Sequence, residues 1–150
     1  MGNRSSPQWK AWAACTKAGI AYALIVFLIG FGAGTIRVLL VAPRIGETIA
    51  VLLEAPVMLL ASWITSRWAT SRFDVPTELS ARILMGMFAF FVLMTAELGV
   101  SLVVFGKSVV EHISGYGSIP GAIGLAAQLC FAGFPAAQLR RAFCGRPSPP

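Results

Sequence analysis

Three ionisable residues, Arg37, Glu54 and Glu97, interrupt long apolar stretches of the chain. Charged side chains in such surroundings are costly to bury, so they are expected to pair with one another or to serve a function. If all three met, one arginine would face two carboxylates, and the repulsion between like charges would leave one carboxylate in need of a proton or a cation. The chemistry that this cluster supports is therefore the binding of a proton or a small cation.

Arg37 and Glu54 lie at similar distances from a predicted turn. Proline ends a helix and glycine allows a reversal in Pro43-Arg44-Ile45-Gly46, which predicts a hairpin of two helices. With a rise of about 1.5 Å per residue, Arg37 lies roughly 9 Å before the turn and Glu54 roughly 12 Å after it. The matched depths predict an ion pair between these two side chains within the membrane.

Glu97 is predicted to lie about 15 Å below the outer end of its helix, which is close to the depth of the other two charges. It could join them in one polar cluster. In the alternative interpretation, Arg37 and Glu54 only lock the hairpin, and Glu97 stays neutral and hydrogen-bonded to Thr95, Ser101 or a neighbouring helix. Polar residues often hold helices together in membrane bundles, so both interpretations remain open.

A second charged pair, Arg44 and Glu47, is predicted at the outer mouth of the hairpin. Glu47 precedes Glu54 by seven residues, which places the two carboxylates on one helix face. In a functional interpretation, Glu47 is a vestibule carboxylate that leads toward Glu54. In the simpler interpretation, Arg44 and Glu47 are a solvated capping pair at the start of a helix.

Glycines at helical spacing predict close contacts between helices. Gly30 and Gly34 have the small-xxx-small spacing that lets two helix backbones approach, and Gly121 and Gly124 are interpreted in the same way. The glycine run at 30–34 is not a phosphate-binding loop, because no strand precedes it and no Lys-Ser/Thr follows it.

Other constellations give no catalytic or metal site. Ser108, Glu111 and His112 are adjacent in one short loop without a nucleophile-elbow motif, so a hydrolase site is not predicted. One histidine and three unclustered cysteines offer no ligand set for a transition metal, and we predict neither a metal nor a cofactor.

The elements that position these residues follow from composition. The chain has 150 residues, of which 57% are hydrophobic and 12% charged. Soluble domains carry about 25% charged residues, so a soluble enzyme, a disordered chain and a disulfide-stapled secreted module are all excluded. We predict an all-α integral membrane protein with four transmembrane helices in an up-down bundle. The expected helices are 18–42, 47–66, 77–106 and 119–139, in one domain at 18–140 between polar tails at 1–17 and 141–150.

The distribution of basic residues predicts the orientation. Nine of the twelve lysines and arginines fall on one side of the predicted topology: Arg4, Lys10, Lys17, Arg67, Arg72, Arg82, Arg140, Arg141 and Arg146. Because cytoplasmic loops are enriched in Lys and Arg, both termini are predicted to be cytoplasmic, in a cell (inner) membrane. The net charge of +6 then needs no nucleic-acid partner.

Two functions remain. The first is a non-enzymatic helix-packing or accessory subunit, either a homo-oligomer or part of a larger membrane complex. The alternative is a small proton- or cation-coupled transporter or channel that uses Glu54 and Glu97. The expected partners are the lipid bilayer and other membrane subunits, together with a proton or small cation in the second case.

Overall fold

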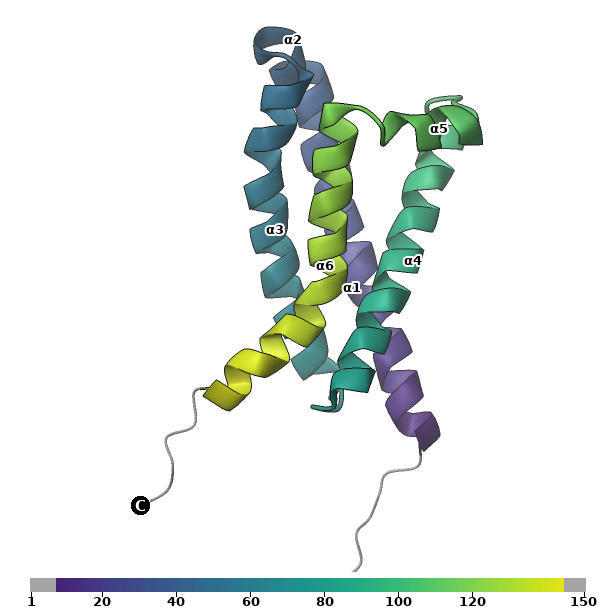
Figure 1. The fold of residues 1–150 in the computed structure, drawn as a ribbon. Coiled ribbons are helices and arrows are strands. Elements are labelled where there is room, and N and C mark those ends of the chain that lie inside the picture. The colour runs from purple at the N-terminus through teal and green to yellow at the C-terminus, as the bar shows by residue number, and fades with distance from the viewer. Residues whose placement is uncertain (1–7, 145–150) are drawn as a thin grey trace, which may run out of the picture.

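The computed structural model describes the backbone of residues 8–144 and the side chains of residues 9–139. All of its regular elements in that range are helices, and four of them are long and apolar enough to cross a membrane. The prediction of an all-helical chain with four candidate membrane spans is confirmed. Figure 1 shows the helices side by side in one bundle.

The elements follow one another along the chain in this order: α1 Gln8–Ile36, the π-helix η1 Arg37–Val41, α2 Ala42–Ile45, α3 Glu47–Arg72, α4 Leu79–Val103, α5 Val109–Gly115 and α6 Ile119–Cys144. The segments α1, η1 and α2 together form the first candidate span, and α3, α4 and α6 form the others. The short helix α5 lies between the predicted helices 77–106 and 119–139, where no helix is predicted.

The first and last helices are longer than predicted. Helix α1 begins at Gln8 rather than at 18, and α6 continues to Cys144 rather than ending at 139. The polar tails predicted at 1–17 and 141–150 are therefore partly helical. Alanines at 11, 13 and 14 favour helix strongly, and the nearby Lys10 and Lys17 do not interrupt it, because straight-chain residues also have good helix propensity.

A π-helical segment and a glycine make the first turn. The backbone N–H of Ala42 donates to the carbonyl of Arg37, five residues back. Ala42 begins the short α2, and Pro43 is in its first turn. Gly46 follows with φ of 85° and ψ of 153°, a conformation that is essentially restricted to glycine. The glycine predicted to reverse the chain therefore does so, and α3 begins at the next residue.

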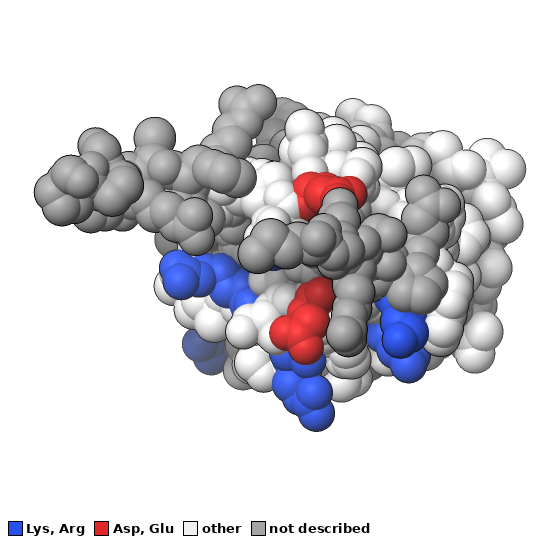
Figure 2. Space-filling view, turned by 90° about the horizontal axis from the view of Figure 1, so that it is seen from below, with Lys and Arg blue, Asp and Glu red and all other residues white. Residues whose placement is uncertain are grey.

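The two ends of the bundle differ in charge. At the end where α1 begins, α3 ends and α4 begins, which we call the basic end, the described basic residues are Lys10, Lys17, Arg67, Arg72 and Arg82. Figure 2 views the bundle from that end and shows Lys and Arg side chains around it. The opposite end contains the α2–α3 turn and α5 (Figure 1), with Arg37, Arg44 and Lys107 nearby.

Helix α1 packs against α3 and α4, and α6 packs against the same two helices from its own side. The main apolar core joins α1, α4 and α6 through residues such as Tyr22, Met85 and Phe131, each of which is at most 2% exposed. Many large apolar side chains on the outer faces remain exposed, as expected of helices that lipid covers.

Two glycines permit the closest helix crossings. A Cβ atom on Gly19 of α1 would lie 2.8 Å from the carbonyl oxygen of Met85 in α4. A Cβ atom on Gly86 of α4 would collide with the carbonyl oxygen of Ala132 in α6. At both crossings the absence of a side chain lets two backbones meet, which is how membrane helices gain packing contacts.

Helix α6 bends in its second half (Figure 1), where it contains Pro135. Proline has no N–H, so the carbonyl of Phe131, four residues earlier, loses its helical partner. The buried Tyr22 of α1 donates its hydroxyl to that carbonyl over 3.0 Å. The rings of Tyr22 and Phe131 also stack, with centroids 4.2 Å apart.

Candidate intramembrane charge sites

Arg37 and Glu54 form an ion pair between η1 and α3. Arg37 Nε lies 2.6 Å from Glu54 Oε2, and the two side chains are 24% and 19% exposed. Arg37 Nε is buried, and the Glu54 carboxylate is the charged group that faces it. The pair that matched depth predicts is present in the structure.

The outer pair differs from the prediction. Glu47 Oε1 lies 3.9 Å from Arg37 Nη1, and no ion pair joins Glu47 to Arg44 within the described side chains. Arg44 belongs to the short α2, before the Gly46 reversal, whereas Arg37 belongs to the π-helical segment that faces α3. Arg37 therefore forms ion pairs with both Glu54 and Glu47 of α3. The Glu47 side chain remains 68% exposed.

Glu97 has a different partner, Gln128 of α6. The Gln128 amide nitrogen donates to both carboxylate oxygens of Glu97, at 2.7 and 2.6 Å. The amide oxygen of Gln128 is buried and accepts no hydrogen bond. This pair ties α4 to α6, as the interpretation of Glu97 as a residue bonded to a neighbouring helix predicted.

The three intramembrane charges are therefore not one cluster. In the described part of the chain, Glu97 forms no ion pair or hydrogen bond with Arg37 or Glu54. One charged pair joins the first hairpin, and one polar pair joins the later helices. Arg37 pairs with Glu54 but makes no ion pair or hydrogen bond with Glu97 among the described side chains.

Two polar side chains near the opposite end, His112 and Tyr116, contact each other and helix α4. His112 of α5 and the Tyr116 hydroxyl lie 3.1 Å apart, and that hydroxyl also donates to the sulfur of Met94 over 3.8 Å. Met94 precedes Glu97 by three residues on α4, which places both on one helix face. Burial raises the pKa of Tyr116, and the nearby negative charge of Glu97 raises it further.

Ser108 and Glu111 form a helix cap. The Ser108 hydroxyl accepts the backbone N–H of Glu111, and the Glu111 carboxylate accepts the backbone N–H of Ser108 over 2.7 Å. This reciprocal capping box satisfies two backbone donors at the start of α5. Both side chains are therefore engaged in capping the helix. The Ser108 bonds are the largest cause that lowers the pKa of Glu111.

The glycines predicted for helix packing have different surroundings. A Cβ on Gly30 would lie 3.0 Å from the Met58 side chain of α3, and one on Gly121 would collide with the carbonyl of Gly115 in α5. A Cβ on Gly34 or Gly124 would meet nothing within 4 Å. Of these four predicted glycines, only Gly30 and Gly121 permit close contacts within this chain.

Three residues that make contacts between helices were not predicted from the sequence. Gln128 is not among the predicted site residues, although an amide in an apolar stretch is a signal that it has a polar partner. Gly19 lies four residues from both Cys15 and Ala23, so the small-xxx-small spacing was visible there too. Gly86 has no such local signal, because its role depends on where α6 crosses α4.

No known protein family, curated protein or solved structure matches this chain.

Proposed function

We propose that the chain is a non-enzymatic, multi-pass membrane protein that works as a homo-oligomer or as a subunit of a larger membrane complex. The observation that carries the proposal is the open space at Gly34 and Gly124, where a Cβ would meet nothing within 4 Å. Gly34 follows Gly30 by four residues and Gly124 follows Gly121 by three, so each pair lies on one helix face. Such faces let another transmembrane helix approach closely. Because no helix of this chain occupies the space beside Gly34 and Gly124, we infer that a helix of another chain packs there.

The internal charge pairs support the same proposal. Arg37 is engaged by Glu54 and Glu47, and Glu97 by Gln128. Charges and amides that are paired across helices in lipid stabilise a defined bundle. These contacts give Arg37, Glu54 and Glu97 a structural role that needs no substrate.

Gly34→Leu tests this proposal. The leucine would fill open space in the isolated chain but would block a helix from a partner, so we expect loss of the assembly with an intact fold. Gly32→Leu is the matched control, because it makes the same substitution two residues away, on the other side of the same helix, where a Cβ would also meet nothing within 4 Å. Native mass spectrometry of the protein from lipid nanodiscs gives the readout. A wild-type chain that is monomeric and partner-free would contradict the proposal.

The proposal includes an orientation, with helices of alternating direction in an up-down bundle and both termini in the cytoplasm of a cell (inner) membrane. It is supported by the excess of lysine and arginine at the basic end, which the positive-inside rule places in the cytoplasm. Single cysteines at two exposed serines test it in a cysteine-free background. An impermeant maleimide should label Ser114→Cys in intact cells but Ser71→Cys only after permeabilisation, and the reverse pattern would invert the topology.

One observation favours a second candidate, a proton- or cation-coupled transporter. The Gln128 oxygen is buried without a hydrogen-bond donor beside Glu97, and Tyr116, which contacts His112, lies near enough to that carboxylate for its charge to raise the pKa of Tyr116. A protonated Glu97 would offer the missing donor if the amide were reoriented, so the site can accept a proton. Buried polar groups that lack a partner often have a function.

Flux measurements separate the two candidates. In proteoliposomes under a pH gradient, a transporter should lose proton flux in Glu97→Gln, whereas Glu78→Gln should keep it because Glu78 precedes the span. Glu54→Gln is tested in the same way. Equal flux in empty liposomes and in wild-type proteoliposomes would rule out the transport function for protons, and would leave the subunit proposal unaffected.

A further inference from the structure

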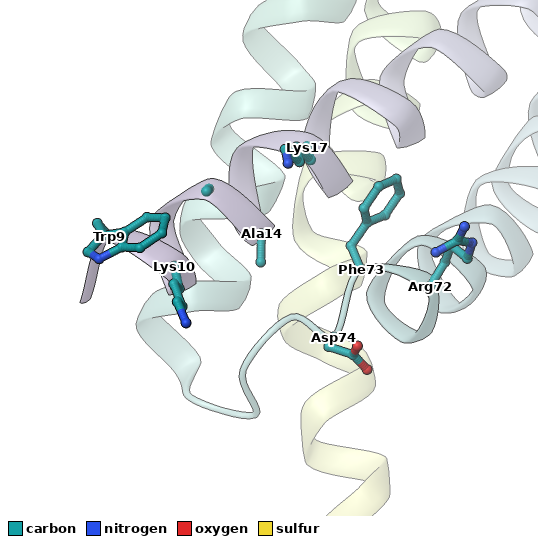
Figure 3. Close-up of a pocket in the computed structure, with 8 residues that line it drawn as sticks. Trp9, Lys10, Ala14, Lys17, Arg72, Phe73 and Asp74 are labelled. Atoms are coloured by element: carbon teal, nitrogen blue, oxygen red, sulfur yellow. The ribbon is translucent and has the colours of Figure 1, made fainter. Parts of the chain in front are cut away.

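A groove of about 340 Å³ lies at the basic end of the bundle, between the first turns of α1 and the α3–α4 connection. Its charged and aromatic lining consists of Trp9, Lys10, Lys17, Arg72, Phe73 and Asp74. Figure 3 shows the Phe73 ring extending from the end of α3 toward α1.

The charge of this groove is unbalanced. Lys10, Lys17 and Arg72 bring three positive charges, and Asp74 brings one negative charge. None of these four takes part in an ion pair among the described side chains. Two of the three cations lie over aromatic rings, with Lys10 Nζ 5.6 Å from the Trp9 ring centroid and Arg72 Cζ 5.9 Å from that of Phe73. An anion is the ligand that this arrangement favours.

The position of the groove indicates which anion. Trp9 and Trp12 are 67% and 57% exposed at the start of the first candidate span, and exposed tryptophans prefer the headgroup region of a bilayer. The apolar part of α1 continues directly from this point into the membrane. Lipid phosphates lie at the same depth, and clustered basic residues at membrane-helix ends attract anionic lipids.

We propose that this groove binds the phosphate-bearing headgroup of an anionic phospholipid. Lys10, Lys17 and Arg72 contact the phosphate, while the Trp9 and Phe73 rings pack against the glycerol and the upper acyl chains. Lysine binds phosphate as a mobile point charge and arginine as a two-pronged donor, so the set suits a headgroup that moves in the bilayer plane. The site rests on the membrane placement of the chain and does not depend on its oligomeric state.

The test uses Trp9 as the reporter of a bound lipid. The full chain with Trp12→Phe, Trp63→Phe and Trp68→Phe retains one tryptophan at the groove. It is reconstituted in phosphatidylcholine vesicles that contain a minor fraction of brominated phosphatidylglycerol or, in parallel, of brominated phosphatidylcholine. We expect the anionic lipid to quench Trp9 fluorescence several-fold more strongly than the neutral lipid. Equal quenching by the two lipids would overturn the proposal.

Charge variants localise the effect. Lys10→Gln, Lys17→Gln and Arg72→Gln should each weaken the relative affinity for phosphatidylglycerol about fivefold, the effect of one basic residue near a membrane surface. Arg67→Gln is the matched control, since it removes the same charge from the same end but lies outside the groove lining. An equal loss in Arg67→Gln would assign the preference to diffuse surface charge and overturn a defined site.

A soluble competitor separates the two sources of phosphate. Inorganic phosphate and glycerol phosphate are added to the vesicles at constant ionic strength. The proposal expects neither to restore the fluorescence quenched by the brominated lipid. Full restoration would identify a site for free phosphate and would overturn the lipid assignment. Native mass spectrometry of the same variants tests the subunit proposal separately, because it reports assembly rather than bound lipid.

Discussion

The hydroxyl of Tyr22 on α1 donates a hydrogen bond to the backbone carbonyl of Phe131 on α6, and that carbonyl is available because Pro135 cannot donate to it. A break in one helix thus becomes an attachment point for another. An unpaired carbonyl in lipid would be costly, so the tyrosine stabilises the bend as well as the contact between the helices.

Tyr22→Phe should destabilise the bundle by about 0.6–1.7 kcal/mol, the range measured for interhelical hydrogen bonds in membranes. In a Pro135→Ala background the new alanine N–H competes for the Phe131 carbonyl, so the same Tyr22→Phe change should cost less. Unfolding in mixed detergent micelles measures the four free energies of this cycle. Equal costs in both backgrounds would show that proline and tyrosine act independently.

Removing one member of the Arg37–Glu54 pair should be more damaging than removing both. Arg37→Gln leaves Glu54 as an unpaired charge in the membrane, with an expected cost of about 2.5–3.5 kcal/mol. The double variant Arg37→Gln/Glu54→Gln carries no such charge and should recover part of that stability. The same unfolding assay gives the coupling free energy. A double variant that loses the sum of the two single costs would contradict the interaction.

The crossing of α4 and α6 should not tolerate a methyl group at Gly86. Gly86→Ala places a Cβ against the Ala132 carbonyl, and we expect a loss of about 1–3 kcal/mol from overpacking. Gly99→Ala is the control on the same helix, because its Cβ would meet nothing within 4 Å. Alanine there should be neutral or slightly stabilising, since it has the higher helix propensity. Equal effects at the two sites would contradict the close crossing.

The cap of α5 should weaken in acid. The bonds from Ser108 lower the pKa of Glu111 in the folded protein, so the cap is fully formed above the ordinary pKa of a glutamate. Its contribution is lost as the pH falls through the lowered pKa of the folded state. Carbon-13 NMR of the Glu111 carboxyl follows the titration. Ser108→Ala removes the hydroxyl bond but keeps the backbone N–H, which is the larger cause, so it should raise this pKa only part of the way toward its ordinary value. An unchanged pKa would contradict the contribution of the hydroxyl.

The helices and the depth of their charges could be predicted from the sequence, because the bilayer sets both. The contacts that depend on how each helix is rotated about its own axis could not. Four apolar windows and the depth of Arg37 and Glu54 follow from bilayer thickness and the cost of a buried charge. Gln128 as the partner of Glu97 depends on which faces of α4 and α6 meet, and helices that are apolar on most sides do not encode that rotation. Glu47 reaches Arg37 rather than Arg44 because a π-helical segment re-aims the chain before the turn.

The uneven distribution of contacts along the bundle has a mechanical consequence. The tight crossings at Gly19 and Gly86, together with most of the apolar core, lie toward the basic end, whereas the opposite end has few buried residues. Dense backbone packing resists separation more than a few side-chain pairs do. We therefore expect the helices to separate more easily at the opposite end, where the Arg37–Glu54 and Glu97–Gln128 pairs limit their separation. Any force or binding event that acts on the opposite end meets the more compliant part of the protein.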